Sequence, residues 1–351
     1  MKQHSSAGRS PVSRPLRRAG IVLAFACAAA LGWSSPAAPA ALSAGGGDLA
    51  PTNAPPAPGY ESGPQVLAAI GRGEIKLVKT PEEMPPGVVE ESNLEYGSPG
   101  GRSLRLDLFH PASVAKPVPG LIFIHGGAWS GGDRKMLRVY GMSYARKGYV
   151  TACISYRLSG EATSPAAIQD CKCAVRWLRD NAGKYHVNPD QIGVIGGSAG
   201  GHLAMMLGYA SDPSLEGDGG HTGVSSKVQA VVNFYGVYDM TTPACRVAGP
   251  VVKFVGGKSY AEAPELYTRV SPVHYLAKGA PPTLILHGTI DDLVPISQSD
   301  ALADRLRELG VPFVYDRLPG WPHAMDMAEV VNQRCQFMMD AFFARHLPLP
   351  R

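Results

Sequence analysis

Short runs rich in apolar and β-branched residues alternate with helical patterns along most of the chain. The later helical stretches carry apolar residues at i, i+3 and i+4 spacing, which predicts amphipathic helices. Strands that alternate with helices predict βαβ units and therefore a parallel sheet. The predicted strands cover residues 88–96, 103–110, 120–127, 149–158, 191–197, 228–236, 282–288 and 313–320, and the predicted helices cover residues 166–185, 199–209, 297–309 and 327–346.

The residues within these strands indicate how the sheet is covered. The first two runs alternate polar and apolar residues with no helix between them, which predicts an antiparallel hairpin at the sheet edge. The runs LIFI (121–124), GVIG (193–196) and TLIL (283–286) are apolar on both faces, as expected when helices cover both sides. We therefore predict one doubly wound α/β domain with eight strands, most of them parallel.

The first 40 residues have the pattern of a secretory signal peptide. Five of the 33 Lys and Arg residues lie there without any acid, and they precede an apolar stretch at 21–31 that is followed by small residues. This stretch is about half as long as a membrane-spanning helix requires. We expect export to the periplasm or the medium, with no stable membrane insertion after cleavage. Arg17-Arg18 and Cys27 leave a twin-arginine or lipoprotein signal as alternatives.

Two further segments depart from the strand and helix rhythm. Residues 41–65 are rich in Pro, Ala and Gly, which predicts a flexible linker. Residues 66–351 then form the predicted domain. Within it, residues 237–280 are rich in Pro and Gly and carry several Tyr and Phe residues, which predicts a cap-like insertion over the site.

Charge and cysteine content limit the classes of partner. Beyond the first 40 residues, 28 Lys and Arg face 29 Asp and Glu with no basic run, so nucleic acid is not an expected partner. Five cysteines remain outside the signal, and we expect buried thiols, although the sequence leaves their pairing open. No Cys and His cluster has zinc spacing, so no metal is predicted.

The sequence GGSAG at 196–200 carries the main chemical signal. It is a G-x-S-x-G pattern between the predicted strand 191–197 and the helix that begins at 199. A strand that turns directly into a helix places the central residue, Ser198, in a strained elbow for which only glycine neighbours leave room. A simple Gly-rich turn is the alternative, and the placement between strand and helix favours the elbow.

A serine nucleophile needs a base and an acid that orients the base. His323 lies just past the last predicted strand, at the edge where such sheets bind ligands. Asp291 and Asp292 directly follow the strand TLILHG, and either one could be the orienting carboxylate or a helix cap. The order Ser198, Asp, His323 is the order expected for a serine hydrolase on this kind of sheet. His202 shares a helix with Ser198 and is expected to pack structurally.

The motif HGGAW at 125–129 follows the strand LIFI. Its small residues allow backbone N–H groups to approach a substrate oxygen and, together with the N–H of Ala199, to form an oxyanion hole. A tight turn is the alternative for this motif taken alone.

Together these motifs resemble the bacterial feruloyl and acetylxylan esterase-like branch of the α/β-hydrolases, which is related to the hormone-sensitive-lipase group. The resemblance extends from about residue 93 to 347. The segments that carry it are HGGAWSGGDR (125–134), DCKCAVRWLRDNAGKYHVNPDQIGVIGGSAGGHLA (170–204), GDGGHTGVSSKVQAVVNFYG (217–236), LHGTIDDLVP (286–295) and LPGWPHAMD (318–326).

The resemblance implies an α/β-hydrolase fold and roles for individual residues. The acid of the L-x-H-G-x-x-D pattern falls on Asp291, and the oxyanion donors fall on Gly127, Ala128 and Ala199. Ala128 and the pair Trp321-Pro322 stand where relatives more often have smaller residues, which bears on pocket size. The aromatic residues expected to contact substrate are Trp129, Tyr235 and Trp321.

These observations predict a secreted serine carboxylesterase that cleaves short-chain or aromatic acyl esters through an acyl-enzyme, without a cofactor. Export and the resemblance favour acetyl or feruloyl groups on polysaccharides. The same residues could cleave amides, as formamidases and some peptidases do. A non-catalytic binding protein on the same scaffold is a further alternative, disfavoured because all three triad residues are present. The sequence does not indicate an oligomeric state.

Overall fold

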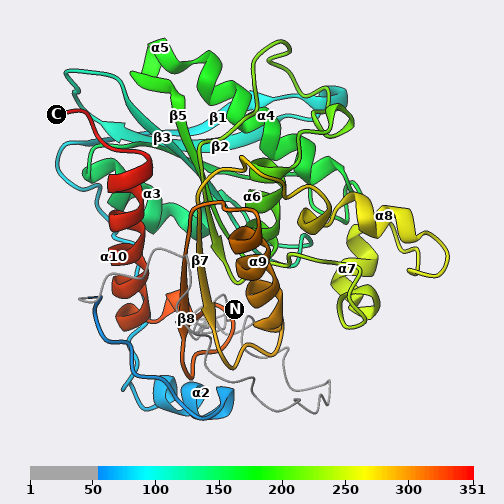
Figure 1. Ribbon diagram of the computed structural model, residues 1–351. Helices are drawn as coiled ribbons and strands as arrows, with labels where there is room; N and C mark the ends of the chain where they lie inside the picture. The colour runs from blue at the N-terminus through cyan, green and yellow to red at the C-terminus, as the bar shows by residue number, and fades with distance from the viewer. Residues whose placement is uncertain (1–53) are drawn as a thin grey trace, which may run out of the picture. The chain divides into compact units, whose positions relative to one another are not determined.

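The computed structural model describes residues 54–351, so the expected signal peptide and residues 41–53 of the expected linker lie outside the described residues. Eight strands form one sheet in the order β1-β2-β4-β3-β5-β6-β7-β8 (Figure 1). The strands are β1 (Val88–Gly97), β2 (Leu104–Pro111), β3 (Val118–Ile124), β4 (Val150–Ile154), β5 (Val187–Gly197), β6 (Ala230–Phe234), β7 (Thr283–Gly288) and β8 (Phe313–Leu318).

The sheet confirms the predicted eight-stranded, mostly parallel arrangement. β1 pairs with β2, and β2 with β4, in antiparallel fashion at one edge. From β4 onward every neighbouring pair is parallel. The carboxyl ends of β3, β5, β6, β7 and β8 therefore meet at one edge of the sheet, where loops from distant parts of the chain converge.

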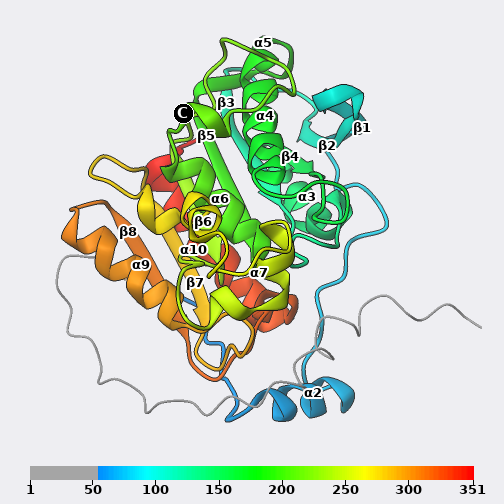
Figure 2. The same ribbon diagram turned by 90° about the vertical axis from the view of Figure 1, so that its right-hand side faces the viewer.

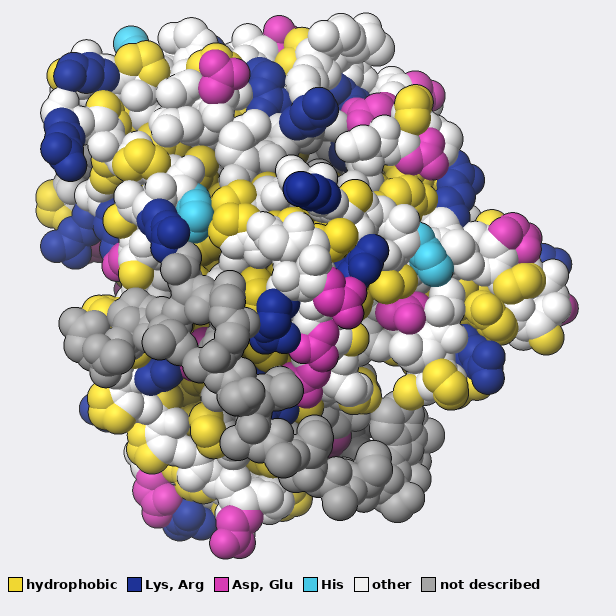
Figure 3. Space-filling view, in the orientation of Figure 1, with side chains coloured by type: hydrophobic (Ala, Val, Ile, Leu, Met, Phe, Trp, Pro, Cys, Tyr) yellow, Lys and Arg dark blue, Asp and Glu magenta, His cyan; other side chains and the backbone are white. Residues whose placement is uncertain are grey.

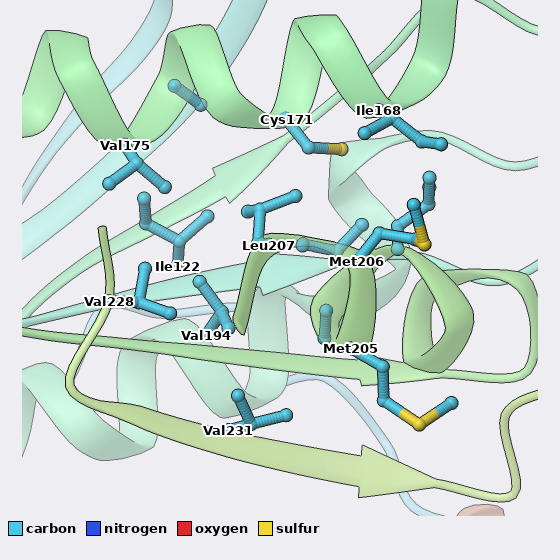
Figure 4. Close-up of a cluster of buried hydrophobic side chains, with 14 of the residues drawn as sticks. Ile122, Ile168, Cys171, Val175, Val194, Met205, Met206, Leu207, Val228 and Val231 are labelled. Atoms are coloured by element: carbon cyan, nitrogen blue, oxygen red, sulfur yellow. The ribbon is translucent and has the colours of Figure 1, made fainter. Parts of the chain in front are cut away.

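Helices cover both faces of the sheet (Figures 1 and 2). Successive residues of β3 point to opposite faces of the sheet. Leu121 and Phe123 pack with α3 and α10. Ile122 packs with α4 and α6 on the other face (Figure 4). The helices are α2 (Gly63–Gly71), α3 (Arg138–Arg146), α4 (Ala166–Asp180), α5 (Ala182–Tyr185), α6 (Ala199–Tyr209), α7 (Gly249–Phe254), α8 (Pro264–Arg269), α9 (Ser297–Glu308) and α10 (Glu329–His346). Of these, α2, α3, α7 and α8 were not predicted.

The segment that was expected to insert into the fold, residues 237–280, contains α7 and α8. Phe254 of α7 stacks on Trp129 in the loop after β3, with ring centroids 4.8 Å apart. The carbonyl of Val270 accepts a hydrogen bond from His202 Nε2 of α6 at 2.6 Å. The insertion therefore packs on both the loop after β3 and α6.

Residues 54–78 contact the loop that follows β8, although the linker was expected to continue to residue 65. Tyr60 N–H donates to the carbonyl of Gly320 at 2.9 Å, and the indole N–H of Trp321 donates to the carbonyl of Ala57 at 3.0 Å. Farther along, residues 76–78 pair with residues 327–329: Val78 N–H donates to Met327, and Glu329 N–H donates to Lys76, both at 2.8 Å. We call residues 54–78 the N-terminal strap.

The remaining features of the described residues concern cysteines, membranes and charge. The cysteines at 153, 171, 173, 245 and 335 are all buried free thiols. Among the helices within residues 54–351, none is long and apolar enough to cross a membrane. On the face shown in Figure 3, basic and acidic side chains are interspersed.

Candidate active site

The connection between β5 and α6 is a single residue, Ser198. β5 ends at Gly197 and α6 begins at Ala199, so the chain turns within one residue. Ser198 adopts φ 57° and ψ −121°, a strained backbone conformation for a residue with a side chain. Its N–H donates to the carbonyl of Phe234 at 2.9 Å, which ties the turn to the end of β6.

Two glycines of this segment have no room for a side chain. A Cβ at Gly196 would lie 2.2 Å from the carbonyl oxygen of Gly200, and a Cβ at Gly200 would lie 2.0 Å from that of Ile124. The first turn of α6 can approach β3 and β5 this closely only because both positions are glycine. The G-x-S-x-G spacing is thus a packing requirement of the turn.

The side chain of Ser198 contacts His323, which lies in the loop after β8. Ser198 Oγ is 2.9 Å from His323 Nε2. His323 Nδ1 is 2.7 Å from Asp291 Oδ2, so Nδ1 carries a proton and Nε2 is free to accept one from the serine hydroxyl. The side chain of His323 is 13% exposed, which leaves it open to solvent on one side.

The carboxylate beside His323 belongs to Asp291, whereas Asp292 is exposed. The side chain of Asp291 is fully buried, and its Oδ1 accepts the N–H groups of Leu293 and Val294, both at 2.9 Å. Burial alone would raise its pKa, but the charge of His323 and hydrogen bonds from histidine outweigh burial and hold the pKa of Asp291 well below its usual range. Asp291 therefore remains an anion at neutral pH.

The loop after β3 lies against the Ser198 turn. A Cβ at Gly126 would lie 3.3 Å from the Cβ of Ser198. Gly127, Ala128 and Trp129 have φ values of 109°, 52° and 54°, so three successive residues adopt left-handed backbone conformations. A Cβ at Gly127 would lie 2.4 Å from the carbonyl oxygen of Gly131, and this position therefore requires glycine.

The N–H groups of Gly127, Ala128 and Ala199, which are the expected oxyanion donors, are not used in backbone hydrogen bonds among residues 54–351. Within residues 54–351, the N–H groups of Gly127 and Ala128 donate to no backbone carbonyl. Ala199 is the first residue of α6, where N–H groups have no partner inside the helix and the helix dipole favours negative charge. The described residues also contain no group of three or more His, Cys, Asp or Glu side chains arranged to hold a metal ion.

The model of the BD-FAE protein family matches residues 106–306, which is more than half of the chain. The chain belongs to the BD-FAE family. Among curated proteins, the esterase LipQ of Mycobacterium tuberculosis is 35% identical over 283 residues, which cover 78% of this chain and 66% of LipQ. The chain spans 62% and 55% of the length of two further mycobacterial relatives.

Solved structures extend the BD-FAE match to the three-dimensional fold. A truncated carbohydrate esterase from gut microbiota is 28% identical with a TM-score of 0.65, and the match covers 75% of this chain and 99% of that one. Esterase 2 of Thermogutta terrifontis, solved after phosphoramylation by tabun, is 26% identical with a TM-score of 0.64, and the match covers 78% of this chain and all of that one. The fold is therefore that of the α/β-hydrolases, as predicted.

The N-terminal strap and the loop it contacts both lie outside the 106–306 region matched by the BD-FAE family. The loop carries His323, and the strap contacts it on both sides of that residue. The part of the chain described by the family model thus contains Ser198 and Asp291, and the remainder contains His323 and the strap that contacts its loop.

The three aromatic residues expected to contact substrate are all buried by contacts within the protein. Trp129 is 3% exposed, and its indole N–H donates to His202 Nδ1 at 3.2 Å. Trp321 is 1% exposed and faces the strap, where its ring meets Tyr60 edge-on at 5.8 Å. Tyr235 is 6% exposed and packs its ring against His323 at 4.6 Å. Each of the three rings therefore packs against another aromatic or histidine side chain of the protein.

The sequence reasoning missed His287, a second histidine on Asp291. His287 is buried at the end of β7, and its Nε2 lies 3.1 Å from Asp291 Oδ2 and 2.9 Å from the carbonyl of Val294. Its Nδ1 lies 2.7 Å from Ser299 Oγ. The available signal was the spacing of four residues between His287, next to the last residue of β7, and Asp291 in the loop.

Proposed function

We propose that this protein is a secreted serine carboxylic ester hydrolase in which Ser198 is the nucleophile, His323 the base and Asp291 the orienting acid. The observation that carries the proposal is the continuous hydrogen-bonded chain from Ser198 Oγ through His323 to Asp291, with contacts of 2.9 and 2.7 Å. Membership of the BD-FAE family and similarity to proteins named esterases support it. So does similarity to an esterase phosphoramylated by tabun, since covalent phosphorylation is expected of an activated nucleophile.

The proposed reaction has two acyl-transfer steps. His323 Nε2 removes the proton of Ser198 as Oγ attacks the ester carbonyl carbon, and the imidazolium then gives that proton to the departing alcohol. This leaves an acyl group on Ser198. A water molecule, deprotonated by the same nitrogen, attacks the acyl-enzyme, releases the carboxylic acid and returns the proton to Oγ.

The oxyanion of each tetrahedral intermediate is proposed to bind the N–H groups of Gly127, Ala128 and Ala199. These donors are fixed before the substrate arrives, because the loop after β3 is held in its left-handed conformation and Ala199 is fixed at the start of α6. In serine hydrolases, loss of one such donor costs about 3 kcal/mol of transition-state stabilisation.

The proposed substrates are short-chain or aromatic acyl esters, and among them acetyl or feruloyl groups on polysaccharides. The carbohydrate esterase among the structural relatives supports a saccharide alcohol. The basic and apolar pattern of residues 1–40 supports export to where such polymers occur. Side-by-side assays of acetylated xylan, acetylated pectin, methyl ferulate and p-nitrophenyl acetate test this assignment, and activity on the p-nitrophenyl ester alone would contradict the polysaccharide assignment.

The Ser198→Ala variant tests the nucleophile. We expect it to keep the fold and to lose nearly all p-nitrophenyl acetate turnover and fluorophosphonate labelling. Ser143→Ala is the matched control, because Ser143 is a serine of α3 that hydrogen-bonds to Gln336 and not to a histidine. Substantial activity in a folded Ser198→Ala protein would overturn the proposal.

A further inference from the structure

Asp326, the last residue of the LPGWPHAMD motif, has no role in the reaction described so far. It lies three residues after His323, and both of its carboxylate oxygens accept hydrogen bonds from tyrosines. Tyr235 donates to Oδ1, and Tyr140 of α3 donates to Oδ2 at 3.0 Å. Asn332 of α10 donates to the Tyr140 hydroxyl at 2.7 Å and to the backbone carbonyl of Asp326 at 3.0 Å. These bonds fix the loop that follows His323.

Tyr235 connects this carboxylate to His323. Its ring centroid lies 4.6 Å from that of His323, at an interplanar angle of 59°. Its backbone has φ 39° and is held by a 2.9 Å bond from its N–H to the carbonyl of Leu286. A Cβ at Gly197 would lie 3.1 Å from the Tyr235 hydroxyl, so the tyrosine fills the space between the Ser198 turn and the imidazole.

His323 becomes a cationic neighbour of Asp326 when it takes up a proton. Within residues 54–351 no Lys or Arg side chain forms an ion pair with Asp326. Burial raises the pKa of Asp326, and the tyrosine hydroxyls and the charge of His323 offset part of that effect. The other groups that face it, the hydroxyls of Tyr235 and Tyr140 and the nearby thiol of Cys335, are neutral because burial raises the pKa of each.

We propose that Asp326 is a positioning residue for His323. Through the hydroxyl of Tyr235 it holds the aromatic ring against the imidazole, and its carboxylate, whose two oxygens each accept a tyrosine hydroxyl, favours the imidazolium that forms when His323 takes the proton of Ser198. This inference rests on the proposed function. His323 thus has two carboxylate neighbours, Asp291 in direct contact and Asp326 through Tyr235, and it also contacts Ser198 Oγ.

The two parts of the proposal have separate readouts. Removing the charge of Asp326 makes the imidazolium less favourable, so the acid limb of the kcat/KM profile moves to lower pH. We expect a shift of about one pH unit, because the charge acts on the imidazole through Tyr235 and not in direct contact. Releasing the ring of Tyr235 lowers kcat and leaves KM unchanged, because the ring orients a base and does not bind substrate.

The experiment compares Asp326→Asn and Tyr235→Phe with wild type and with Asp340→Asn in the full chain. Asp340 also lies at the α3 and α10 side of the sheet, where it pairs with Lys147, so its variant makes the same charge change away from Tyr235. We measure the pH dependence of kcat and kcat/KM for p-nitrophenyl acetate, and the unfolding temperature of each protein. Asp326→Asn is expected to shift the acid limb by about one unit and Tyr235→Phe to lower kcat about tenfold. The double variant is expected to lose less than the sum of the two effects.

The outcomes separate this inference from the proposed function. If wild type is active and Ser198→Ala is inactive, but Asp326→Asn leaves the acid limb at the wild-type pH, Asp326 does not act on His323. A loss of activity at all pH values that follows the loss of unfolding temperature would assign Asp326 a purely structural role and overturn the proposal. Absence of esterase activity in wild type would instead remove the proposed function itself.

Discussion

His287 and His323 approach the same oxygen of Asp291, at 3.1 Å and 2.7 Å. Nε2 of His287 faces Asp291 Oδ2 and the carbonyl of Val294, which can only accept, so this nitrogen carries a proton, while Nδ1 lies 2.7 Å from Ser299 Oγ. Asp291 Oδ1 is meanwhile occupied by two backbone N–H groups. Both oxygens of the carboxylate thus accept hydrogen bonds that hold it in place. The position of the carboxylate in turn sets the orientation of His323.

Removal of this second histidine should weaken both the site and the fold. We expect His287→Ala to lower kcat about tenfold and to reduce the free energy of unfolding by about 2 kcal/mol, because Asp291 and Ser299 lose a buried partner. Steady-state kinetics and urea unfolding measure the two effects. His221→Ala is the control, since His221 also contacts a carboxylate, Asp180, but at an exposed position. If His287→Ala had the same kcat and the same free energy of unfolding as His221→Ala, the role given to His287 would be wrong.

Replacement of Asp291 and of its neighbour Asp292 should have very different effects on kcat. Asp291→Asn should lower kcat by about 10³- to 10⁴-fold while the protein stays folded, because an amide in this position favours the wrong tautomer of His323. Asp292→Asn should keep near-wild-type kcat, since that side chain is exposed. Equal losses in the two variants would show that the hydrogen bond to His323 is not what matters.

The stability of the protein should fall in mild acid because of His202. Burial lowers the pKa of His202 to about 4, and the neutral ring is fully bonded: Nδ1 accepts from Trp129 and Nε2 donates to Val270. The folded-state pKa lies below the unfolded value of 6.5, so this stabilisation is complete above pH 6.5 and is lost as the pH falls towards 4. The expected loss between pH 7 and 4.5 is about 2 kcal/mol.

Urea unfolding of His202→Gln at both pH values measures this contribution. An amide can accept from Trp129 and donate to Val270 but does not titrate. The variant should therefore lose less stability than wild type over the same interval. Parallel losses in the two proteins would mean that His202 does not titrate in this range.

A side chain at Gly200 should prevent the Ser198 turn from forming. Gly200→Ala places a Cβ 2.0 Å from the carbonyl oxygen of Ile124, so we expect a loss of at least about 3 kcal/mol of stability and of all esterase activity. Gly183→Ala in α5 meets no atom within 4 Å and should change the free energy of unfolding by less than about 1 kcal/mol. Thermal unfolding and activity assays distinguish the two, and a stable, active Gly200→Ala protein would contradict the geometry.

Trp321 should affect stability and not substrate binding. Trp321→Phe removes the hydrogen bond to Ala57, which should lower the free energy of unfolding by about 1 kcal/mol. KM for p-nitrophenyl acetate should stay at the wild-type value because the ring faces the strap. A raised KM at unchanged stability would restore Trp321 as a substrate contact.

The strands of this fold could be predicted because their apolar patterns are unbroken, but two helical regions could not be predicted well. Gly141 in the middle of α3 lowers helix propensity, yet a Cβ there would lie 2.9 Å from Cys153 and Phe109, so packing against β2 and β4 requires it. The predicted helix 166–185 divides at Asn181, whose side-chain amide donates to the carbonyl of Trp177 and ends α4.

For the site, chain order and spacing were sufficient to bring Ser198 and His323 together as candidates. Residue types alone left Asp291 and Asp292 as alternatives, because the choice depends on which carboxylate the loop after β7 turns inward. The burial of Trp321 could not be foreseen, since the strap contacts it through main-chain atoms such as the carbonyl of Ala57. A Pro- and Gly-rich composition does not reveal contacts of that kind.

The strap has a practical consequence for exchanging parts between relatives. Residues 54–78 and 319–329 form one interlocked unit, in which a Cβ at Gly59 would lie 1.9 Å from the carbonyl oxygen of Pro319 and one at Gly320 would lie 2.4 Å from the nitrogen of Tyr60. A chimera that takes residues 319–329 from one parent and residues 54–78 from another would pair two segments whose close backbone contacts need not fit each other. Shuffling experiments should therefore move these two distant stretches together.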